Sequence, residues 1–321
     1  MKLAALQFDA KFGQVGINIA CADAILAASP PKDVDLLVLP ELAFTGYNHT
    51  PASIASLLEP TAKGVSTEWA ISTAAKFDCL VTVGYPERCT DGPELLAYNS
   101  TVTVDQHGKV LAHYRKTHLY YTDESWAKEG PEKWLVTNLP FHKHADTEVK
   151  GQTVLKAAFG ICMDLNPYQF TAPWDAYEFC TAAIEGQAQI LVLSMAWLSS
   201  LPADELRELP LEPDHSTFSY WINRLMPFLG TDNEVIIICA NRAGEEDGKN
   251  PCGQLEGGVR YAGTSWIGKI SNGRVSVWGM LGRHEEGLLL ADLEEPSRLN
   301  FRVAKPIVTT EEAVSQGDIQ E

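Results

Sequence analysis

Cys162 ends an apolar stretch, AAFGICMDLNPY (157–168), just before the chain turns at Asn166-Pro167. This pattern predicts a strand that ends at the cysteine, with Asn166 as the N-cap and Pro167 as the first residue of a helix. Backbone N–H groups at such a turn can stabilise a thiolate or an oxyanion. Cys162 is therefore a candidate nucleophile. The alternative is a small buried side chain, as most free cysteines are.

A nucleophilic cysteine needs a base, and none of the eight histidines has an obvious claim to that role. A carboxylate can serve when burial raises its pKa. Glu41 follows the apolar run DLLVLP and Pro40, and is a candidate base; a solvated loop glutamate is the alternative. The segment AHYRKTHLYYTDESW contains Lys116, which could stabilise an oxyanion, and a second acid, Glu124. The alternative is that Arg115-Lys116 is an exposed basic pair with no such role.

The elements that must position these residues are short strands rich in Val, Ile and Leu, separated by helical stretches. The strand-like runs are KLAALQF, DLLVLP, CLVTVGY, VLKAAFGIC, QILVLSMAW, EVIIICANR and GLLLADL. The helical patterns are VGINIACADAILAAS, STEWAISTAAKFD, APWDAYEFCTAAIEGQ and HSTFSYWINRLMPFLG. Two antiparallel hairpins turn at residues 105–108 and 271–273. We expect a mixed α/β fold in a single domain over residues 1–321, with a loose polar tail from about residue 309.

The composition argues against several classes of function. A formal net charge of −17 leaves no basic excess for binding nucleic acid. No run reaches the ~18 apolar residues of a membrane span, and the first residues lack the pattern of a signal peptide. The seven cysteines form no Cys-x-x-Cys pair, so we expect a reduced, cytoplasmic protein. The nearest approach to a metal motif, His142 to His144, is expected to be a solvated loop.

Three segments resemble the catalytic segments of the nitrilase, or carbon–nitrogen hydrolase, superfamily. They are LPELAFTGY, YRKTHLYYTDE and FGICMDLNPY, in the order and with the separations usual in that family. The segments LAALQFDAKFGQVGIN, GYPER, ILVLSMAW and ANRAG are also similar to it, so the resemblance covers most of the chain. It implies a four-layer α-β-β-α sandwich with mixed sheets, an enzyme without cofactor or metal, and copies that commonly pair as a homodimer.

The resemblance also implies roles for the matching residues. Glu41 takes the place of the general base, Lys116 that of the oxyanion stabiliser and Cys162 that of the nucleophile. Glu124 matches a second glutamate found in many members, and we expect it to orient Lys116 or the substrate. The backbone N–H of Met163 would face the oxyanion together with Lys116.

Within the family, GICMDLNPYQF is most similar to the branch that deamidates N-terminal Asn and Gln, because an arginine common in other branches is missing. The substrates would then be peptides or proteins that begin with Asn or Gln, and the products would enter a degradation pathway that reads N-terminal residues. Asp164 is the first candidate for binding the α-ammonium; its alternative role is to bond N–H groups at the helix start. Tyr47 and Trp197 are candidates for the pocket wall, with core or interface packing as the alternative.

Other functions remain open at this point. A different amidase of the same superfamily, acting on a small-molecule amide as an ω-amidase does, would keep the same three catalytic residues. A non-catalytic module of this fold would be expected to lack one of them, and all three are present. A metal-dependent hydrolase has little support, because no cluster of ligands is seen in the sequence.

Overall fold

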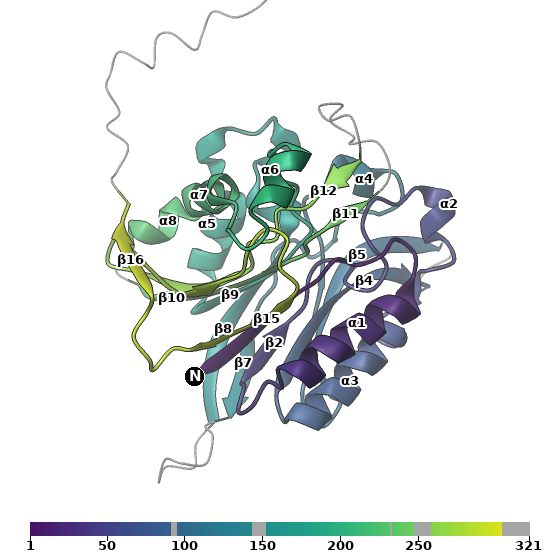
Figure 1. Ribbon diagram of the computed structural model, residues 1–321, viewed down its shortest axis with the longest axis horizontal. Helices are drawn as coiled ribbons and strands as arrows, with labels where there is room; N and C mark the ends of the chain where they lie inside the picture. Colours follow the sequence, from purple (N-terminus) through teal and green to yellow (C-terminus); the bar gives the residue numbers. More distant parts are fainter. Residues whose placement is uncertain (91–94, 143–151, 232, 247–257, 304–321) are drawn as a thin grey trace, which may run out of the picture.

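The computed structural model describes residues 1–90, 95–142, 152–231, 233–246 and 258–303. Within them, two seven-stranded sheets pack face to face, and helices cover both outer sides (Figure 1). The expected four-layer α-β-β-α sandwich with mixed sheets is confirmed. The expected polar tail from about residue 309 lies outside the described residues, as do the last two residues of the His142–His144 motif.

The first sheet has the order β15-β1-β2-β4-β5-β6, with β3 paired to β4. Strands β1, β2 and β4 are parallel neighbours, while β15, β5 and β6 join in antiparallel fashion. The bounds are Lys2–Gln7 (β1), Leu36–Val38 (β2), Glu59–Pro60 (β3), Leu80–Cys89 (β4), Leu96–Val104 (β5), Val110–Arg115 (β6) and Gly287–Asp292 (β15). Because β4–β5 and β5–β6 are both antiparallel, β6 runs in the same direction as β2 and β4.

The second sheet repeats this plan in the order β16-β14-β13-β10-β9-β8-β7. Strands β8, β9 and β10 are parallel neighbours, and the remaining pairs are antiparallel. The bounds are Val136–His142 (β7), Gln152–Ile161 (β8), Ile190–Met195 (β9), Val235–Asn241 (β10), Trp266–Ser271 (β13), Arg274–Met280 (β14) and Leu299–Arg302 (β16). A separate two-stranded ladder joins Glu245–Glu246 (β11) to Val259–Arg260 (β12).

The helices form the two outer layers. Helices α1 and α3 lie against the first sheet, and α5, α7 and α8 lie on the side of the second sheet (Figure 1). Their bounds are Val15–Ala28 (α1), Pro51–Ile54 (α2), Val65–Phe77 (α3), Tyr121–Glu124 (α4), Glu178–Glu185 (α5), Ala203–Glu208 (α6), His215–Arg224 (α7) and Met226–Leu229 (α8). Among the described residues, no helix is long and apolar enough to cross a bilayer.

Burial on both faces explains why the central strands are continuous apolar runs in the sequence. Leu3 and Ala5 of β1 belong to the core between the sheets, whereas Ala4 and Leu6 pack with the side chains of α1 and α3. Alternate residues of a strand point to opposite faces, so a strand covered on both sides needs apolar residues at every position. Each of the predicted strand-like runs contains a strand, and both predicted hairpins are present as β5–β6 and β13–β14.

The predicted helix start at Asn166-Pro167 is wrong. Cys162–Leu165 is a 3₁₀ helix, Asn166 follows its end, and the α-helix begins only at Glu178. The N–H of Asn166 donates to the carbonyl oxygen of Met163 (2.9 Å), which closes a tight turn directly after the strand. The backbone thus turns at the cysteine itself rather than after a short loop.

The two sheets place the carboxyl ends of several strands at one edge. Strands β2, β6 and β8 lead directly to the segments that carry Glu41, Lys116 and Cys162. Across the sheets, the N–H of Glu41 donates to the carbonyl oxygen of Met195 (3.3 Å), and Ser194 Oγ donates to the carbonyl oxygen of Leu39 (2.8 Å). These bonds tie the ends of β2 and β9 together, as expected for a site at the carboxyl edge of parallel strands.

Gly84 of β4 provides a test of how tightly the segment of Glu41 is held. An added Cβ at this position would lie 2.6 Å from the carbonyl oxygen of Pro40 and 2.8 Å from Glu41 Cα, so backbone would have to move. We expect Gly84→Ala to lower the free energy of unfolding by about 1–3 kcal/mol, measured by urea denaturation. The matched control is Gly16→Ala in α1, where a Cβ meets nothing within 4 Å; there the helix should gain ~0.5–1 kcal/mol. Equal stabilities of the two variants would contradict the close approach.

Candidate active site

Lys116 is the centre of a fully buried cluster of charges. Its Nζ lies 2.6 Å from Glu41 Oε1 and 2.5 Å from Asp123 Oδ2, and none of the three side chains is exposed. The residue follows β6 directly, and its N–H donates to the carbonyl oxygen of Asn99 on β5 (2.8 Å). An ammonium in this setting requires anionic partners, because its burial without them would cost several kcal/mol.

Neutral donors hold the two carboxylates in place. Asn99 Nδ2 donates to Glu41 Oε1 (2.7 Å) and to Asp123 Oδ1 (3.1 Å), so one amide group bridges both acids. The N–H of Ala196, directly after β9, donates to Glu41 Oε2 (2.9 Å). Tyr47 Oη donates to Asp123 Oδ2 (3.2 Å). Each acid is thereby oriented by groups from more than one strand end.

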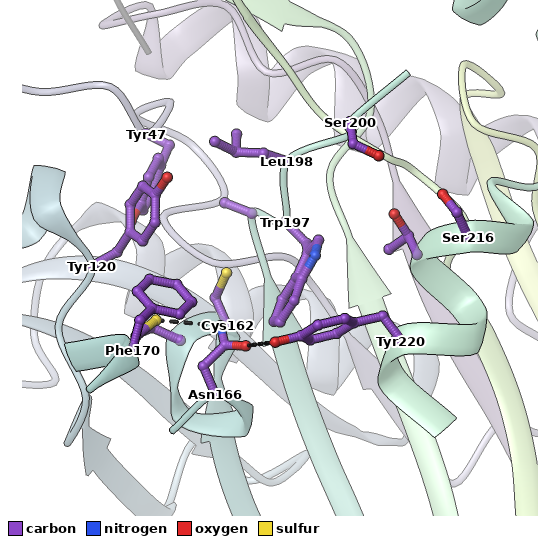
Figure 2. A pocket seen from close by; sticks show the side chains of 13 residues that line it. Tyr47, Tyr120, Cys162, Asn166, Phe170, Trp197, Leu198, Ser200, Ser216 and Tyr220 are labelled. Carbon is purple, nitrogen blue, oxygen red and sulfur yellow. Dashed lines mark hydrogen bonds between the residues drawn. The ribbon is translucent and has the colours of Figure 1, made fainter. Parts of the chain in front are cut away.

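Cys162 begins the 3₁₀ helix after β8 with a positive φ of 43°. A non-glycine residue in this region is under local strain, which is common at functional sites. Its sulfur points into a pocket between Tyr47 and Trp197 (Figure 2). The acids of the cluster and Lys116 are close enough to affect the thiol electrostatically.

The surroundings of Cys162, Glu41 and Lys116 determine the protonation state of each group. Burial raises the pKa of the Cys162 thiol well above its ordinary value; the Glu41 carboxylate adds to this and Lys116 opposes it. Burial raises the pKa of Glu41 to about 7, although Lys116 opposes the shift. Burial alone would lower the pKa of Lys116, but Asp123 and Glu41 outweigh it and raise the pKa. At neutral pH, therefore, a neutral thiol lies beside an acid that can exchange a proton and a permanent ammonium.

Glu124 does not take the position predicted for it. Its side chain is exposed, and the acid that reaches Lys116 is its neighbour Asp123. Asp123 lies in the helical turn Tyr121–Glu124 and also accepts the N–H of Tyr120 (3.1 Å). This bond orients one of two adjacent acids inward. The signal in the sequence was an acid three residues after the residue that starts the turn, a pattern typical of helix capping.

Asp164 is not a binding group for a substrate ammonium. Its buried carboxylate accepts the N–H groups of Thr117 (3.1 Å), His118 (2.8 Å) and Ile161 (2.8 Å), together with Tyr114 Oη (2.8 Å). These donors occupy the lone pairs of both oxygens. The alternative role, bonding of N–H groups at the turn, is the one that the structure shows. Asp164 thereby joins the turn of Cys162 to the segment that follows Lys116.

The pocket above Cys162 has a volume of about 530 Å³. Tyr47, Trp197 and Met163 line it, as does Ala196. Further lining residues, mostly aromatic or hydroxyl-bearing, were not predicted from the sequence: Tyr120, Asn166, Phe170, Leu198, Ser200, Ser216, Thr217 and Tyr220. Asn166 Oδ1 accepts a bond from Tyr220 Oη (2.6 Å), which fixes one wall (Figure 2). These residues come from helix α7 and from segments far apart in the sequence, so no local pattern marked them.

No cluster of three or more His, Cys, Asp or Glu side chains suited to a metal ion is found in the part of the chain that the structure describes. The acids of the site are instead directed at Lys116.

Comparison with known proteins gives the same picture of the chain. The family model of the carbon–nitrogen hydrolases matches residues 2–172, which carry all three members of the Glu41, Lys116 and Cys162 set. The chain belongs to the carbon–nitrogen hydrolase family. As a member, it is a hydrolase that acts on amide C–N bonds.

Two similar proteins are named protein N-terminal amidases. The one from Schizosaccharomyces pombe is 31% identical over 311 residues, covering 92% of this chain and 100% of the relative. The one from Saccharomyces cerevisiae is 33% identical over 210 residues, covering 62% of this chain and 45% of the relative. A crystal structure of an N-terminal amidase with an Asn-Glu-Ala peptide superimposes with a TM-score of 0.79, at 24% identity, over 95% of this chain and 99% of that chain. This likeness confirms the fold.

The raised pKa of Glu41 predicts the pH dependence of amide hydrolysis. A base must be deprotonated, so kcat/KM should rise with pH through an acid limb near pH 7, a value that belongs to the coupled cluster. Because the Asp123 carboxylate contributes to raising the pKa of Glu41, Asp123→Asn should move this limb to lower pH and also reduce kcat. Ammonia release measured across the neutral range checks both effects.

The exposed neighbour provides the control for this test. Glu124→Gln removes the same charge one residue away and should leave the acid limb and kcat unchanged. If Glu124→Gln moved the limb and Asp123→Asn did not, the assignment of Asp123 would be wrong.

Proposed function

We propose that this protein removes the side-chain amide of Asn or Gln at the N-terminus of peptides and proteins, which yields Asp or Glu and ammonia. The observation that carries the proposal is the Cys162 thiol at a pocket of about 530 Å³, backed by the buried Glu41–Lys116–Asp123 cluster. Similarity over 92% of the chain to a protein N-terminal amidase supports the substrate class.

The first half of the reaction transfers the acyl group to sulfur. Cys162 Sγ attacks the carbon of the side-chain amide while Glu41 takes the thiol proton, as the raised pKa values of both groups require. The negative charge that develops on the amide oxygen would face Lys116 and the N–H of Met163. A well-placed donor of this kind is worth about 3 kcal/mol in the transition state. Glu41 then passes its proton to the leaving nitrogen, which departs as ammonia and leaves a thioester.

The second half releases the acid. Water enters the place of ammonia, and Glu41 takes a proton from it as the water oxygen attacks the thioester carbon. The same oxyanion donors act again, and the proton returns from Glu41 to the sulfur. The product carries Asp or Glu at its N-terminus. Lys116 keeps its proton throughout, because two carboxylates hold it.

The pocket suits a cationic N-terminal residue for two reasons. Behind Cys162, two carboxylates face one ammonium, so the cluster has a negative excess whenever Glu41 is ionised. Around the entrance, Tyr120, Phe170 and Trp197 offer aromatic faces, which attract an ammonium group. The side chains of Asn and Gln differ by one methylene, a difference worth only ~1–3 kcal/mol, so acceptance of both residues is physically easy.

An amidase for a small-molecule amide is the second candidate, because the same catalytic residues would serve it. A relative from Bacillus subtilis named 2-oxoglutaramate amidase is 30% identical, but over only 118 residues, or 37% of this chain. The two candidates differ in whether the substrate must carry a peptide and a free α-ammonium. A homodimer and a cytoplasmic location stay predictions.

A peptide panel tests the proposed function. Peptides that begin with Asn or Gln should release ammonia and gain the mass difference between an amide and an acid, detected by mass spectrometry. N-acetylated versions of the same peptides should react far more slowly, because the acetyl group removes the positive charge. Equal rates on free and acetylated peptides would contradict recognition of the α-ammonium, and turnover of free glutamine alone would favour the second candidate.

The nucleophile has its own test within that panel. Cys162→Ala should reduce ammonia release to background, since among the residues that the structure describes the other sulfur lining the pocket is the thioether of Met163, which is no nucleophile of this kind. Cys21→Ala in α1, which lies outside the pocket, should keep the wild-type rate. Retained turnover in Cys162→Ala would remove the proposed mechanism.

A further inference from the structure

Glu246, at the end of the short strand β11, forms a buried ion pair with Arg242. Arg242 itself is held by the carbonyl oxygen of Ala10 (2.7 Å) and stacks over the ring of Tyr261, with its Cζ 3.9 Å from the centroid. Burial would raise the pKa of Glu246, but the charge of Arg242 and the hydrogen bonds from Asn48, Tyr47 and Tyr261 together outweigh it, and the pKa is lowered. Glu246 is therefore a carboxylate at neutral pH, although it is not part of the cluster around Lys116.

Both carboxylate oxygens of Glu246 accept hydrogen bonds from the backbone that carries the pocket residue Tyr47. Oε1 accepts the N–H of Tyr47 (2.9 Å), and Oε2 accepts the N–H of Asn48 (2.9 Å) and Tyr261 Oη (2.8 Å). The contact is close: a Cβ added to Gly46, whose φ is +80°, would lie 2.6 Å from Glu246 Oε1. The turn at Gly46 and the carboxylate thus fit together, and the position of Tyr47 follows from that fit.

Tyr47 carries this constraint to the charged cluster. Its hydroxyl donates to Asp123 Oδ2 (3.2 Å), the same oxygen that lies 2.5 Å from Lys116 Nζ. Its ring also contacts Lys116, with Nζ 5.6 Å from the centroid. A displacement of the Tyr47 backbone would therefore disturb Asp123 and the Lys116 ammonium that pairs with it.

We propose that Glu246, anchored by Arg242, is a positioning residue for catalysis that sets Tyr47 against Asp123 and so fixes Lys116. The effect is indirect, because Glu246 reaches the reacting atoms only through Tyr47. The activity assay that tests this inference rests on the proposed function. The inference itself concerns the catalytic cluster and not the choice of substrate.

A carboxylate is needed here because all of its partners are donors. Replacement of either oxygen by the NH₂ group of glutamine would set a donor against a backbone N–H group, and would remove the nearer of the two carboxylates that pair with Arg242, the other being Asp9 (3.7 Å). A small displacement of a group that positions catalytic atoms can cost up to about 100-fold in rate. The loss should appear in kcat, since the ammonium acts mainly on the transition state.

The test is a double-mutant cycle of Glu246→Gln and Tyr47→Phe, assayed with a peptide that begins with Asn. Each single variant should lower kcat by about 10-fold to about 100-fold with a smaller change in KM, and the double variant should be no slower than the slower single variant. Additive losses, or a wild-type kcat in Glu246→Gln, would overturn the proposal. If Glu246→Gln does not fold, Glu246→Asp, which keeps the charge but withdraws the oxygens, replaces it in the same cycle.

Glu59 provides a matched control. It is a buried carboxylate on β3 that likewise accepts a backbone N–H and a hydroxyl, both from Ser66 (2.9 and 2.6 Å), but these donors belong to the first turn of α3. Glu59→Gln should reduce the thermal stability while kcat stays at the wild-type value. A loss of kcat in Glu59→Gln equal to that in Glu246→Gln would show that the effect is one of general stability and would overturn the proposal.

A second measurement separates this inference from the proposed function. If the wild type releases no ammonia from Asn- or Gln-initiated peptides, the proposed function fails, and the cycle is followed by the rate of Cys162 alkylation with iodoacetamide. Without the Tyr47 hydroxyl, the negative charge of Asp123 is less compensated, and this charge disfavours the Cys162 thiolate. Cys162 should therefore be alkylated more slowly in both single variants, and the two effects should not add in the double variant. Unchanged alkylation in Glu246→Gln would overturn the inference on its own.

Discussion

The buried ammonium of Lys116 is the interaction on which the site depends. A lysine with no exposed surface is stable only between anionic partners, and here these are Glu41 and Asp123. The partners in turn need donors, which come from Asn99 on β5, from the backbone after β9 and from Tyr47. These donors come from different strands and loops of both sheets. The buried Lys116 charge, through its two acids, therefore constrains how the sheets pack against each other. Removal of Lys116 would leave two carboxylates in the core without their ammonium.

The architecture satisfies this requirement through repetition. Each sheet contains three adjacent parallel strands, β1, β2 and β4 in one and β8, β9 and β10 in the other. Parallel strands end at the same edge, and packing of the sheets brings both edges together at the site. The hydrogen bond from the N–H of Glu41 to the carbonyl oxygen of Met195 joins them directly. Glu41 and Cys162, which are more than a hundred positions apart in the sequence, are thereby brought close enough to interact electrostatically.

Local pattern predicted the central strands and both hairpins, because apolar runs covered on both faces mark where strands end. The structure places Glu41, Lys116 and Cys162, the three candidates at such strand ends, close together. Local pattern did not predict which of two neighbouring side chains points into the site. Asp123 and Glu124 are adjacent acids in one helical turn. Asp123 is the inner one because it accepts the N–H of Tyr120 and groups from other segments, among them Asn99 and Lys116. Asp164 was misassigned for a related reason: its donors come from a segment more than forty residues earlier in the chain, which no spacing rule reveals. The expected helix after Asn166 is absent: the 3₁₀ turn that Asp164 stabilises precedes Asn166, and only short 3₁₀ segments follow before the α-helix at Glu178.

The protonation states suggest why the nucleophile needs no histidine. In papain-like cysteine sites a cationic partner lowers the pKa of the thiol, so a thiolate exists before the substrate arrives. Here burial raises the pKa of the Cys162 thiol, and the carboxylate of Glu41 raises it further. Since Lys116 holds its proton between two acids, only Glu41, with a pKa of about 7, can accept the proton from sulfur. Thiolate character therefore has to develop together with the attack on the amide carbon. A resting thiol of this kind is also protected from oxidation and alkylation, because it is the thiolate that reacts.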